Sequence, residues 1–265
     1  MEMFCDPVLR WAGGKRWLIP IISPLLPRRY SMYYEPFLGG GAVFFSLIRG
    51  SACLSDLNHE LINFYQILRS KPLRLFNSLY QRHPSKDEYY YIRSRQVQHD
   101  YQRAAKLYYL NRMSFNGLYR VNKYGEFNVP FGRKPSANVV EREGMLQASE
   151  KLRRAIIIQA DFEDAVKNAG RGTIVYFDPP YTAMHSNNGF VKYNENIFRW
   201  EDQVRLSKIA RWLARRGVNV FVSNAGHNSI RKLYKGFSCK IVTRKSMIAA
   251  SSCCRDTINE YLFFT

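Results

Sequence analysis

The 265-residue chain has no apolar run that could cross a membrane, because a spanning helix needs about 18 to 20 consecutive apolar residues. Its first residues, from Met1 to Asp6, lack the basic and then apolar layout of a secretion signal. We therefore expect a cytoplasmic protein with no membrane partner.

Cysteine is scarce as well. The five cysteines are odd in number and scattered along the chain, at Cys5, Cys53, Cys239, Cys253 and Cys254. None belongs to a CxxC pair or to a Cys/His set with the spacing of zinc ligands, so the sequence indicates neither a disulfide framework nor a zinc site. The adjacent Cys253 and Cys254 are expected to be reduced thiols.

Acidic residues are few relative to basic ones. Forty Lys and Arg face 21 Asp and Glu, which gives a formal net charge of +19. Hydrophobic residues make up 46% of the chain, enough to bury a core, so wholesale disorder is excluded. The charge favours a polyanionic partner such as nucleic acid, although some basic proteins simply tolerate their charge.

The first part of the chain, to about residue 56, has the order of an open α/β sheet. Residues 32–34 read as a strand that runs into a glycine turn at 35–41. Residues 42–48 have helical character, and 52–55 read as a second strand that ends at Asp56. Strand, glycine turn, helix and strand in this order are typical of an α/β sheet.

The alternation of strands and helices stops after residue 56 and resumes at about residue 136. Helix-like segments at 61–68 and 101–111 precede a turn-rich patch at 116–127, and the compact apolar runs 155–158 and 173–177 are typical of buried parallel strands. A helix at 204–213 and a strand at 218–222 follow. We predict an α/β domain formed by residues 1–56 and 136–265, with a mostly parallel sheet, and a basic insertion at 57–135.

The tetrapeptide Asp178-Pro179-Pro180-Tyr181 comes directly after the predicted strand at 173–177. Ligands of open α/β sheets bind at the carboxyl ends of the strands. The Asp178 carboxylate and the Pro179 carbonyl could accept the two hydrogens of an exocyclic amine, so that the nitrogen lone pair points at a methyl donor. Tyr181 could stack on a base that has left the duplex. The alternative is a rigid Asp-Pro-Pro turn below a strand.

The glycine turn is a weaker signal. It lets the backbone approach a ligand closely, and Asp56 is placed to accept hydrogen bonds from ribose hydroxyls. Counting from Gly39, the third glycine of a dinucleotide fingerprint is replaced by Phe44, so that fingerprint fails, and a plain tight turn explains the glycines equally well. The segment at 11–15, which has no P-loop pattern, reads in isolation as a loop with a core Trp11 and a surface Lys15.

Taken in chain order, these pieces resemble the DNA adenine-N6 methyltransferases of the Dam family, in group alpha of the D12 class. The resemblance spans nearly the whole chain. Its motifs are Trp11-Ala12-Gly13-Gly14-Lys15, Glu35-Pro36-Phe37-Leu38-Gly39-Gly40-Gly41, Ser55-Asp56-Leu57-Asn58, Leu110-Asn111-Arg112, Phe115-Asn116-Gly117-Leu118-Tyr119-Arg120, Gly125-Glu126-Phe127-Asn128-Val129-Pro130-Phe131-Gly132, Asp161-Phe162, Asp178-Pro179-Pro180-Tyr181 and Ser223-Asn224.

The resemblance implies a Rossmann-like methyltransferase sheet with a helical and β-hairpin target-recognition insertion. It also implies S-adenosylmethionine as the donor, S-adenosylhomocysteine as the product, no metal, double-stranded DNA as the partner, and a monomer of bacterial or phage type that associates with the nucleoid. The catalytic positions are Asp178, Pro179, Pro180 and Tyr181. The positions that match donor contacts are Trp11, Ala12, Gly13, Lys15, Glu35, Pro36, Phe37, Asp56, Asp161, Phe162 and Asp178, with Asp56 on the ribose and Phe162 on the adenine face.

The resemblance also implies which residues meet DNA and where the methyl group goes. The matching positions are Arg10, Phe115, Asn116, Leu118, Arg120, Pro130, Arg133 and Lys134. Arginine can bond guanine in a bidentate fashion, and Leu and Pro can contact thymine methyl groups. The resemblance implies a target like the family's palindromic GATC. The arginines could instead contact phosphates only. Two other activities stay open, a silent DNA-binding regulator and a cytosine-N4 methyltransferase.

Overall fold

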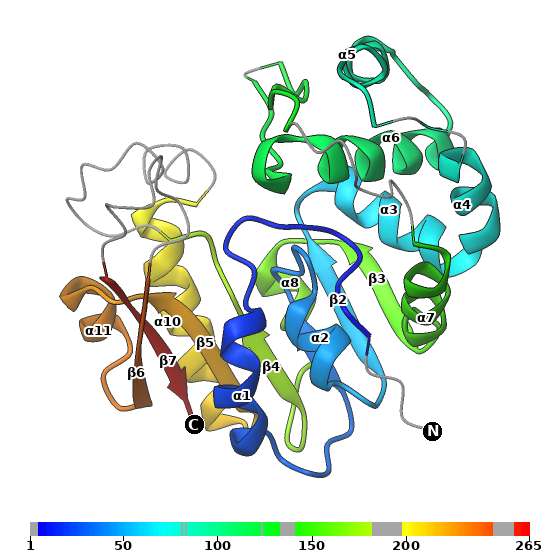
Figure 1. Ribbon diagram of the computed structural model, residues 1–265. Helices are drawn as coiled ribbons and strands as arrows, with labels where there is room; N and C mark the ends of the chain where they lie inside the picture. The colour runs from blue at the N-terminus through cyan, green and yellow to red at the C-terminus, as the bar shows by residue number, and fades with distance from the viewer. Residues whose placement is uncertain are drawn as a thin grey trace. The chain divides into compact units, whose positions relative to one another are not determined.

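The computed structural model describes residues 5–80, 82, 84–122, 124–132, 141–181, 198–245 and 257–265. The fold is mixed α/β with a seven-stranded sheet (Figure 1). The chain divides into two compact units, Met1–Leu26 with Leu38–Gln159, and Pro27–Phe37 with Ala160–Thr265. Within the described ranges, every helix is too short or too polar to cross a membrane.

The first unit surrounds two parallel strands with helices. Strands β2 (Ala52–Asp56) and β3 (Ala155–Gln159) pair in register from Ala52 opposite Ala155 to Asp56 opposite Gln159. The helices are α1 (Ile19–Ile22), α2 (Ala42–Leu47), α3 (His59–Ser70), α4 (Pro72–Tyr80), α5 (Lys86–Ser94), α6 (Asp100–Met113) and α7 (Arg142–Leu152), with 3-10 turns at Arg16–Leu18, Ser23–Leu25 and Phe115–Gly117.

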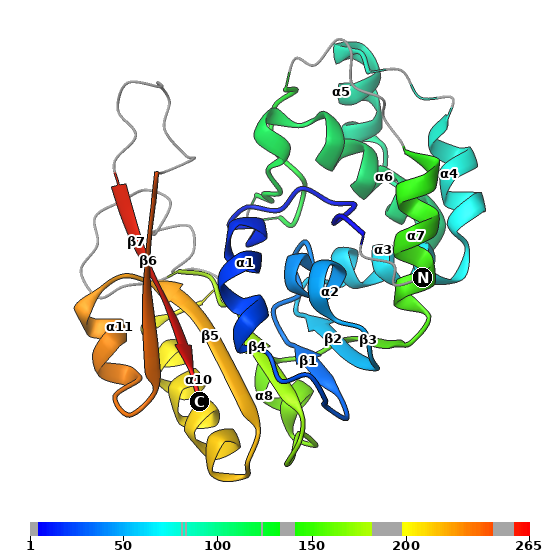
Figure 2. The ribbon, with the colours of Figure 1, turned by 60° about the horizontal axis from the view of Figure 1, so that its bottom comes forward.

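Helix α3 is the centre of the helical part of this unit. Asn58 caps its first turn, because the Asn58 side chain accepts a hydrogen bond from the Leu61 backbone N–H at 3.2 Å. The Phe64 ring stacks on Tyr108 of α6, with 5.9 Å between the ring centroids. Figure 2 shows α3, α4, α6 and α7 gathered side by side.

The second unit holds the other five strands in the order β1-β4-β5-β7-β6. The pairs β1–β4 and β4–β5 are parallel, and β7 pairs antiparallel with β5 and β6 (Figure 2). All four residues of β4 are buried. The elements are β1 (Tyr33–Glu35), β4 (Ile174–Phe177), β5 (Asn219–Ala225), β6 (Ser238–Lys245), β7 (Thr257–Phe264), α8 (Phe162–Val166), α10 (Trp200–Arg215) and α11 (Asn228–Leu233).

These elements confirm the predicted α/β fold, and every strand and helix named from the sequence is present. One expectation was wrong. The run 155–158 forms β3, but β3 is not buried on both faces, since Ile156 is 54% and Ile158 is 37% exposed. Among the described residues β3 pairs only with β2, so it is an edge strand with one uncovered face. Strands β6 and β7 were not predicted from the sequence. The predicted boundaries near residues 56 and 135 stay a prediction.

Candidate active site

The motif Asp178-Pro179-Pro180-Tyr181 begins directly after β4 ends at Phe177. The neighbouring strand β5 runs parallel to β4, with Phe177 opposite Val222, so Ser223 lies level with Asp178. The Ser223 hydroxyl donates a hydrogen bond to Asp178 Oδ1 at 2.6 Å. The Asp178 carboxylate therefore lies at the carboxyl end of two parallel strands, as the sequence predicts.

Two further contacts hold the remainder of the motif. The Gln203 side chain of α10 donates to the Pro180 carbonyl at 3.3 Å and accepts from Asn224 of β5 at 2.9 Å. The Tyr181 hydroxyl donates to Oε2 of Glu260, on β7, at 2.5 Å. Burial raises the pKa of Tyr181 well above its usual value, and the charges of Asp178 and Glu260 raise it further, so the hydroxyl keeps its proton.

The second unit also carries five of the positions predicted to contact the donor. Glu35 is 2% exposed and accepts from the Tyr33 hydroxyl at 2.8 Å, and Pro36 is buried beside it. The Phe37 ring stacks on Phe162, with 5.4 Å between centroids. These side chains form an aromatic and acidic group at the end of β1, in which Glu35, Pro36 and Phe162 are buried and Phe37 is half-buried.

Asp161 and Phe162 already have close partners in the second unit. The Arg205 guanidinium donates to both Asp161 oxygens, at 3.0 and 2.9 Å, and lies 4.2 Å from the centroid of the Phe162 ring. Asp161 also caps α8 through the Glu163 backbone N–H. Phe162 is 2% exposed and contacts Phe37, Phe198 and Arg205, so a nucleobase could stack on it only if one of these side chains moves.

The first unit holds the segment at 11–15 that was read in isolation as a loop with a surface lysine. That interpretation of Lys15 was wrong, because Lys15 is only 4% exposed and its Nζ donates to the Gly13 carbonyl at 2.6 Å. Trp11 is half-buried and stacks on Tyr119 at 5.2 Å, whereas Ala12 and Gly13 are exposed. The Lys15 amine is therefore buried and held in place by its own loop.

Asp56 ends β2 and contacts the glycine turn of the first unit. Its Oδ2 accepts from the Gly39 N–H at 3.1 Å and its Oδ1 from the Asn58 N–H at 3.0 Å. Burial raises the pKa of Asp56, and these backbone hydrogen bonds act in the opposite direction. The Leu57 backbone N–H is a third donor, so the carboxylate uses about three of its four acceptor positions and can accept a further hydrogen bond.

A short hairpin in the first unit carries most of the residues predicted to meet DNA. Isolated bridges pair Ser114 with Phe131 and Val121 with Phe127. Phe115 is 52% exposed, Asn116, Arg120 and Pro130 are also exposed, and Leu118 is half-buried. Arg120 Nε donates to Asn128 Oδ1 at 2.8 Å, across the hairpin. Arg133 and Lys134 lie outside the described residues.

Arg10 is joined to the base of this hairpin through Asn111 of α6. The Arg10 N–H donates to Asn111 Oδ1 at 2.9 Å, and Asn111 Nδ2 donates to the Arg10 carbonyl at 2.6 Å and to the Gly117 carbonyl at 3.2 Å. The structure therefore brings the exposed Arg10 together with the hairpin, as an interface for a polyanion would require.

A family model for D12 class N6 adenine-specific DNA methyltransferases matches residues 11–248. The chain belongs to this family. It is 39% identical over 266 residues to the type II methyltransferase M1.LlaDCHI of Lactococcus lactis subsp. cremoris, covering 97% of this chain and 94% of that protein. It is 35% identical to the type II methyltransferase M.MjaIII of Methanocaldococcus jannaschii, with 93% of each chain covered. The DNA adenine methylase of Escherichia coli K12 is 32% identical, with 96% and 93% covered.

The methyltransferase family confirms the resemblance read from the motifs, and with it the enzyme class. The protein is a DNA adenine methyltransferase, and DNA is its substrate. Family membership disfavours both the silent regulator and the cytosine-N4 methyltransferase, because the family that matches consists of N6 adenine-specific enzymes. In the ranges that the structure describes, no three His, Cys, Asp or Glu side chains lie close enough together to hold a metal ion.

Several residues around the methyltransferase motif were not assigned a role from the sequence. The side chains of Ser223, Gln203 and Glu260 are each at most 2% exposed and contact the motif, and Asn111, also fully buried, holds Arg10. Ser223 and Asn111 stand in motifs that carry the resemblance, which was the only available signal. Gln203 and Glu260 lie in ordinary helix and strand patterns.

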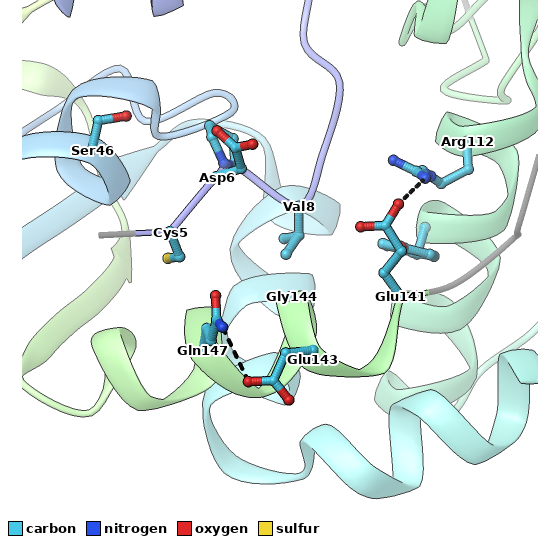
Figure 3. Close-up of a pocket in the computed structure, with 11 residues that line it drawn as sticks. Cys5, Asp6, Val8, Ser46, Arg112, Glu141, Glu143, Gly144 and Gln147 are labelled. Carbon is cyan, nitrogen blue, oxygen red and sulfur yellow. Dashed lines mark hydrogen bonds and ion pairs between the residues drawn. The ribbon is translucent and has the colours of Figure 1, made fainter. Parts of the chain in front are cut away.

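A hollow of about 530 Å³ in the first unit of the methyltransferase is lined by none of the predicted site residues. Figure 3 shows it between the N-terminal segment and α7, where Glu141 meets Arg112 at 3.4 Å and Gln147 donates to Glu143 at 3.0 Å. The prediction of the active site therefore rests on the motif and its position in the sheet, and not on this hollow.

Proposed function

We propose that this methyltransferase takes the methyl group from S-adenosylmethionine and transfers it to N6 of the adenine in GATC, after that adenine has been flipped out of duplex DNA. The observation that supports this most is the Asp178 carboxylate, which follows β4 and is hydrogen-bonded by Ser223 at 2.6 Å. Carboxyl ends of parallel strands are where open α/β folds bind their ligands.

The acceptor amine is a poor nucleophile because its lone pair is delocalised into the adenine ring. Asp178 and the Pro179 carbonyl would accept its two N–H hydrogens and favour a tetrahedral nitrogen. Pro179 and Pro180 stiffen this segment and offer no competing N–H. The Tyr181 ring would stack on the flipped base, and its hydroxyl bond to Glu260 would fix the orientation of the ring.

Asp56 has the chemistry that a nucleoside donor requires. Its two oxygens are oriented by the Gly39, Asn58 and Leu57 N–H groups and keep acceptor capacity for a ribose hydroxyl. When bound, S-adenosylmethionine supplies an electrophilic methyl group on a sulfonium. The other residues proposed to hold it are Trp11, Ala12, Gly13, Lys15, Glu35, Pro36, Phe37, Asp161, Phe162 and Asp178.

Three residues of that group, Lys15, Phe162 and Asp161, have contacts that suggest specific roles in donor binding. The fixed, buried Lys15 ammonium suits the donor carboxylate. Phe162 would pack against the adenine of the donor after a movement of Phe37 or Arg205, which contact its ring. Asp161 would orient this region through its two hydrogen bonds from Arg205.

The exposed hairpin would read the target sequence. Arg120 and Arg10 carry the donors that match guanine, and Leu118 and Pro130 offer apolar contact to thymine methyl groups. Phe115, Asn116, Arg133 and Lys134 complete the set proposed to meet DNA. The net charge of +19 would load the protein onto DNA before the sequence is read.

Labelled donor and matched duplexes test this function. One 20-base-pair duplex carries a single GATC, and its control carries the same bases in permuted order. We expect label in N6-methyladenine of the first duplex only, after nuclease digestion and mass spectrometry. Label spread over both duplexes contradicts the GATC target. 2-Aminopurine at the target adenine should gain fluorescence on binding if the base is flipped, and an unchanged signal contradicts flipping.

A further inference from the structure

The Asp178 carboxylate is supported by a residue outside its own motif. Ser223 is 1% exposed and donates its only hydroxyl hydrogen to Asp178 Oδ1 at 2.6 Å. The Phe177 carbonyl, at 3.5 Å from Ser223 Oγ, is the weaker acceptor. Hydrogen bonds to a charged carboxylate are shorter and about twice as strong as neutral ones. The register of β4 and β5 sets this contact, because Phe177 faces Val222.

Ser223 has a partner of its own in Tyr176. The Tyr176 hydroxyl lies 3.0 Å from Ser223 Oγ. Since the serine hydrogen points at Asp178, Tyr176 must donate and Ser223 accept. Burial, together with the Asp178 charge, raises the pKa of Tyr176 well above its usual value, so its hydroxyl keeps the proton that this bond needs. A chain of two hydrogen bonds thus runs from Tyr176 through Ser223 to Asp178.

We propose that Ser223 is a positioning residue for methyl transfer, orienting the Asp178 carboxylate while Tyr176 orients the Ser223 hydroxyl. The inference rests on the proposed role of Asp178. A carboxylate offers about four acceptor positions, of which Ser223 occupies one and the adenine amine requires one. A small error in the direction of the carboxylate is costly, because transfer requires the acceptor nitrogen to be aligned with the methyl group.

The hydrogen bond from Ser223 also bears on the ionisation of Asp178. Besides Tyr176 and Tyr181, which flank Asp178 on its own segment, the groups around these two tyrosines are Glu35 on β1 and Glu260 on β7. A hydrogen bond donated to a carboxylate favours its ionised form, so the Ser223 donor favours the charged form of Asp178. Loss of the Ser223 hydroxyl should therefore move the acidic limb of the kcat–pH profile to higher pH.

The test compares Ser223→Ala, Tyr176→Phe and the double variant in the full-length enzyme. We expect Ser223→Ala to lower kcat about 10- to 100-fold and Tyr176→Phe about 3- to 10-fold, with KM for DNA and donor affinity changed less than about twofold. Because Tyr176 acts through Ser223, the double variant should match Ser223→Ala in kcat, and the acidic limb should shift in both serine variants.

Two substitutions control for the loss of a buried hydroxyl. The Tyr234 hydroxyl is buried and has no hydrogen-bond partner in the described part of the chain. Among the described residues, the Ser207 hydroxyl bonds only within α10: it donates to the Val204 carbonyl at 2.8 Å and accepts from Arg211 at 3.4 Å. Tyr234→Phe and Ser207→Ala should leave kcat and the pH profile unchanged.

Three results separate the possible outcomes. If Asp178→Ala abolishes transfer but Ser223→Ala keeps wild-type kcat and pH profile, the positioning role is refuted and the proposed function stands. If Asp178→Ala keeps near-normal turnover, the proposed function itself fails. If Ser223→Ala does not fold, Tyr176→Phe, which removes a single oxygen, decides the question: an unchanged kcat and pH profile overturns the chain of hydrogen bonds, and a lowered kcat supports it.

Discussion

Gly39 offers the most direct way to test the glycine turn of the first unit. Its φ is +46°, a left-handed conformation, and a Cβ added there would lie 2.8 Å from Trp11 Cδ1. The Gly39 N–H donates to Asp56, and Trp11 stacks on Tyr119. We predict that Gly39→Ala displaces Trp11 and weakens donor binding.

The size of the effect follows from two costs. A left-handed backbone costs a non-glycine residue about 1–2 kcal/mol. Moving Trp11 away from Tyr119 gives up about 0.5–1.5 kcal/mol of aromatic stacking. Gly125→Ala is the matched control, because Gly125 also has a positive φ, +78°, but a Cβ there would meet no atom within 4 Å. Gly39→Ala should therefore destabilise the protein by about 1 kcal/mol more than Gly125→Ala.

Thermal unfolding and titration calorimetry check both parts of this prediction. In a chain of this size 1 kcal/mol corresponds to about 2–4 °C in Tm, so Gly39→Ala should melt that much below Gly125→Ala. Its affinity for S-adenosylmethionine should fall about tenfold or more, and that of Gly125→Ala should not change. Equal Tm losses in the two variants, or undiminished donor affinity in Gly39→Ala, refute the reasoning.

Three further predictions concern charge. Lys151 donates to the Phe45 carbonyl, and burial lowers its pKa to about 8, so the free energy of unfolding should rise between pH 8 and the normal lysine range. Lys151→Met removes the buried charge, so it should have a higher Tm than the wild type at pH 7, and this difference should shrink by pH 10. A difference in Tm that stays constant over this range contradicts the prediction. Asp56→Ala should weaken S-adenosylmethionine binding about 10- to 100-fold by calorimetry, and an unchanged Kd removes Asp56 from the donor site. Arg120→Ala should reduce discrimination at guanine about 10- to 100-fold, whereas uniform weakening over all sequences, with a salt slope smaller by about 0.9, indicates phosphate contact only.

The sequence predicts the strands and the motif well because their signals are local. The buried run at β4 and the tetrapeptide after it are adjacent in the chain, so the sequence places Asp178 at the end of a strand. Ser223, by contrast, reaches Asp178 only through the register of two strands that are 45 positions apart in sequence. A contact of that kind depends on tertiary pairing and leaves no local pattern.

The errors have physical causes of the same kind. Lys15 is buried because its amine bonds to the Gly13 carbonyl in a tight loop, which a lysine in a glycine-rich stretch does not reveal. Ile156 and Ile158 read as core residues, but their strand has an uncovered face. The partners of Phe162 could not be predicted either, since Arg205 and Phe37 come from distant segments.

The central claim is that the Asp178 carboxylate holds the adenine amine during transfer. The most direct measurement is the single-turnover rate of methyl transfer by Asp178→Ala, with enzyme and S-adenosylmethionine in excess over a GATC duplex, together with its Kd for the same duplex. We predict that the rate falls about 10³-fold while the Kd stays within about twofold of that of the wild type. A rate within about tenfold of the wild type would contradict the account.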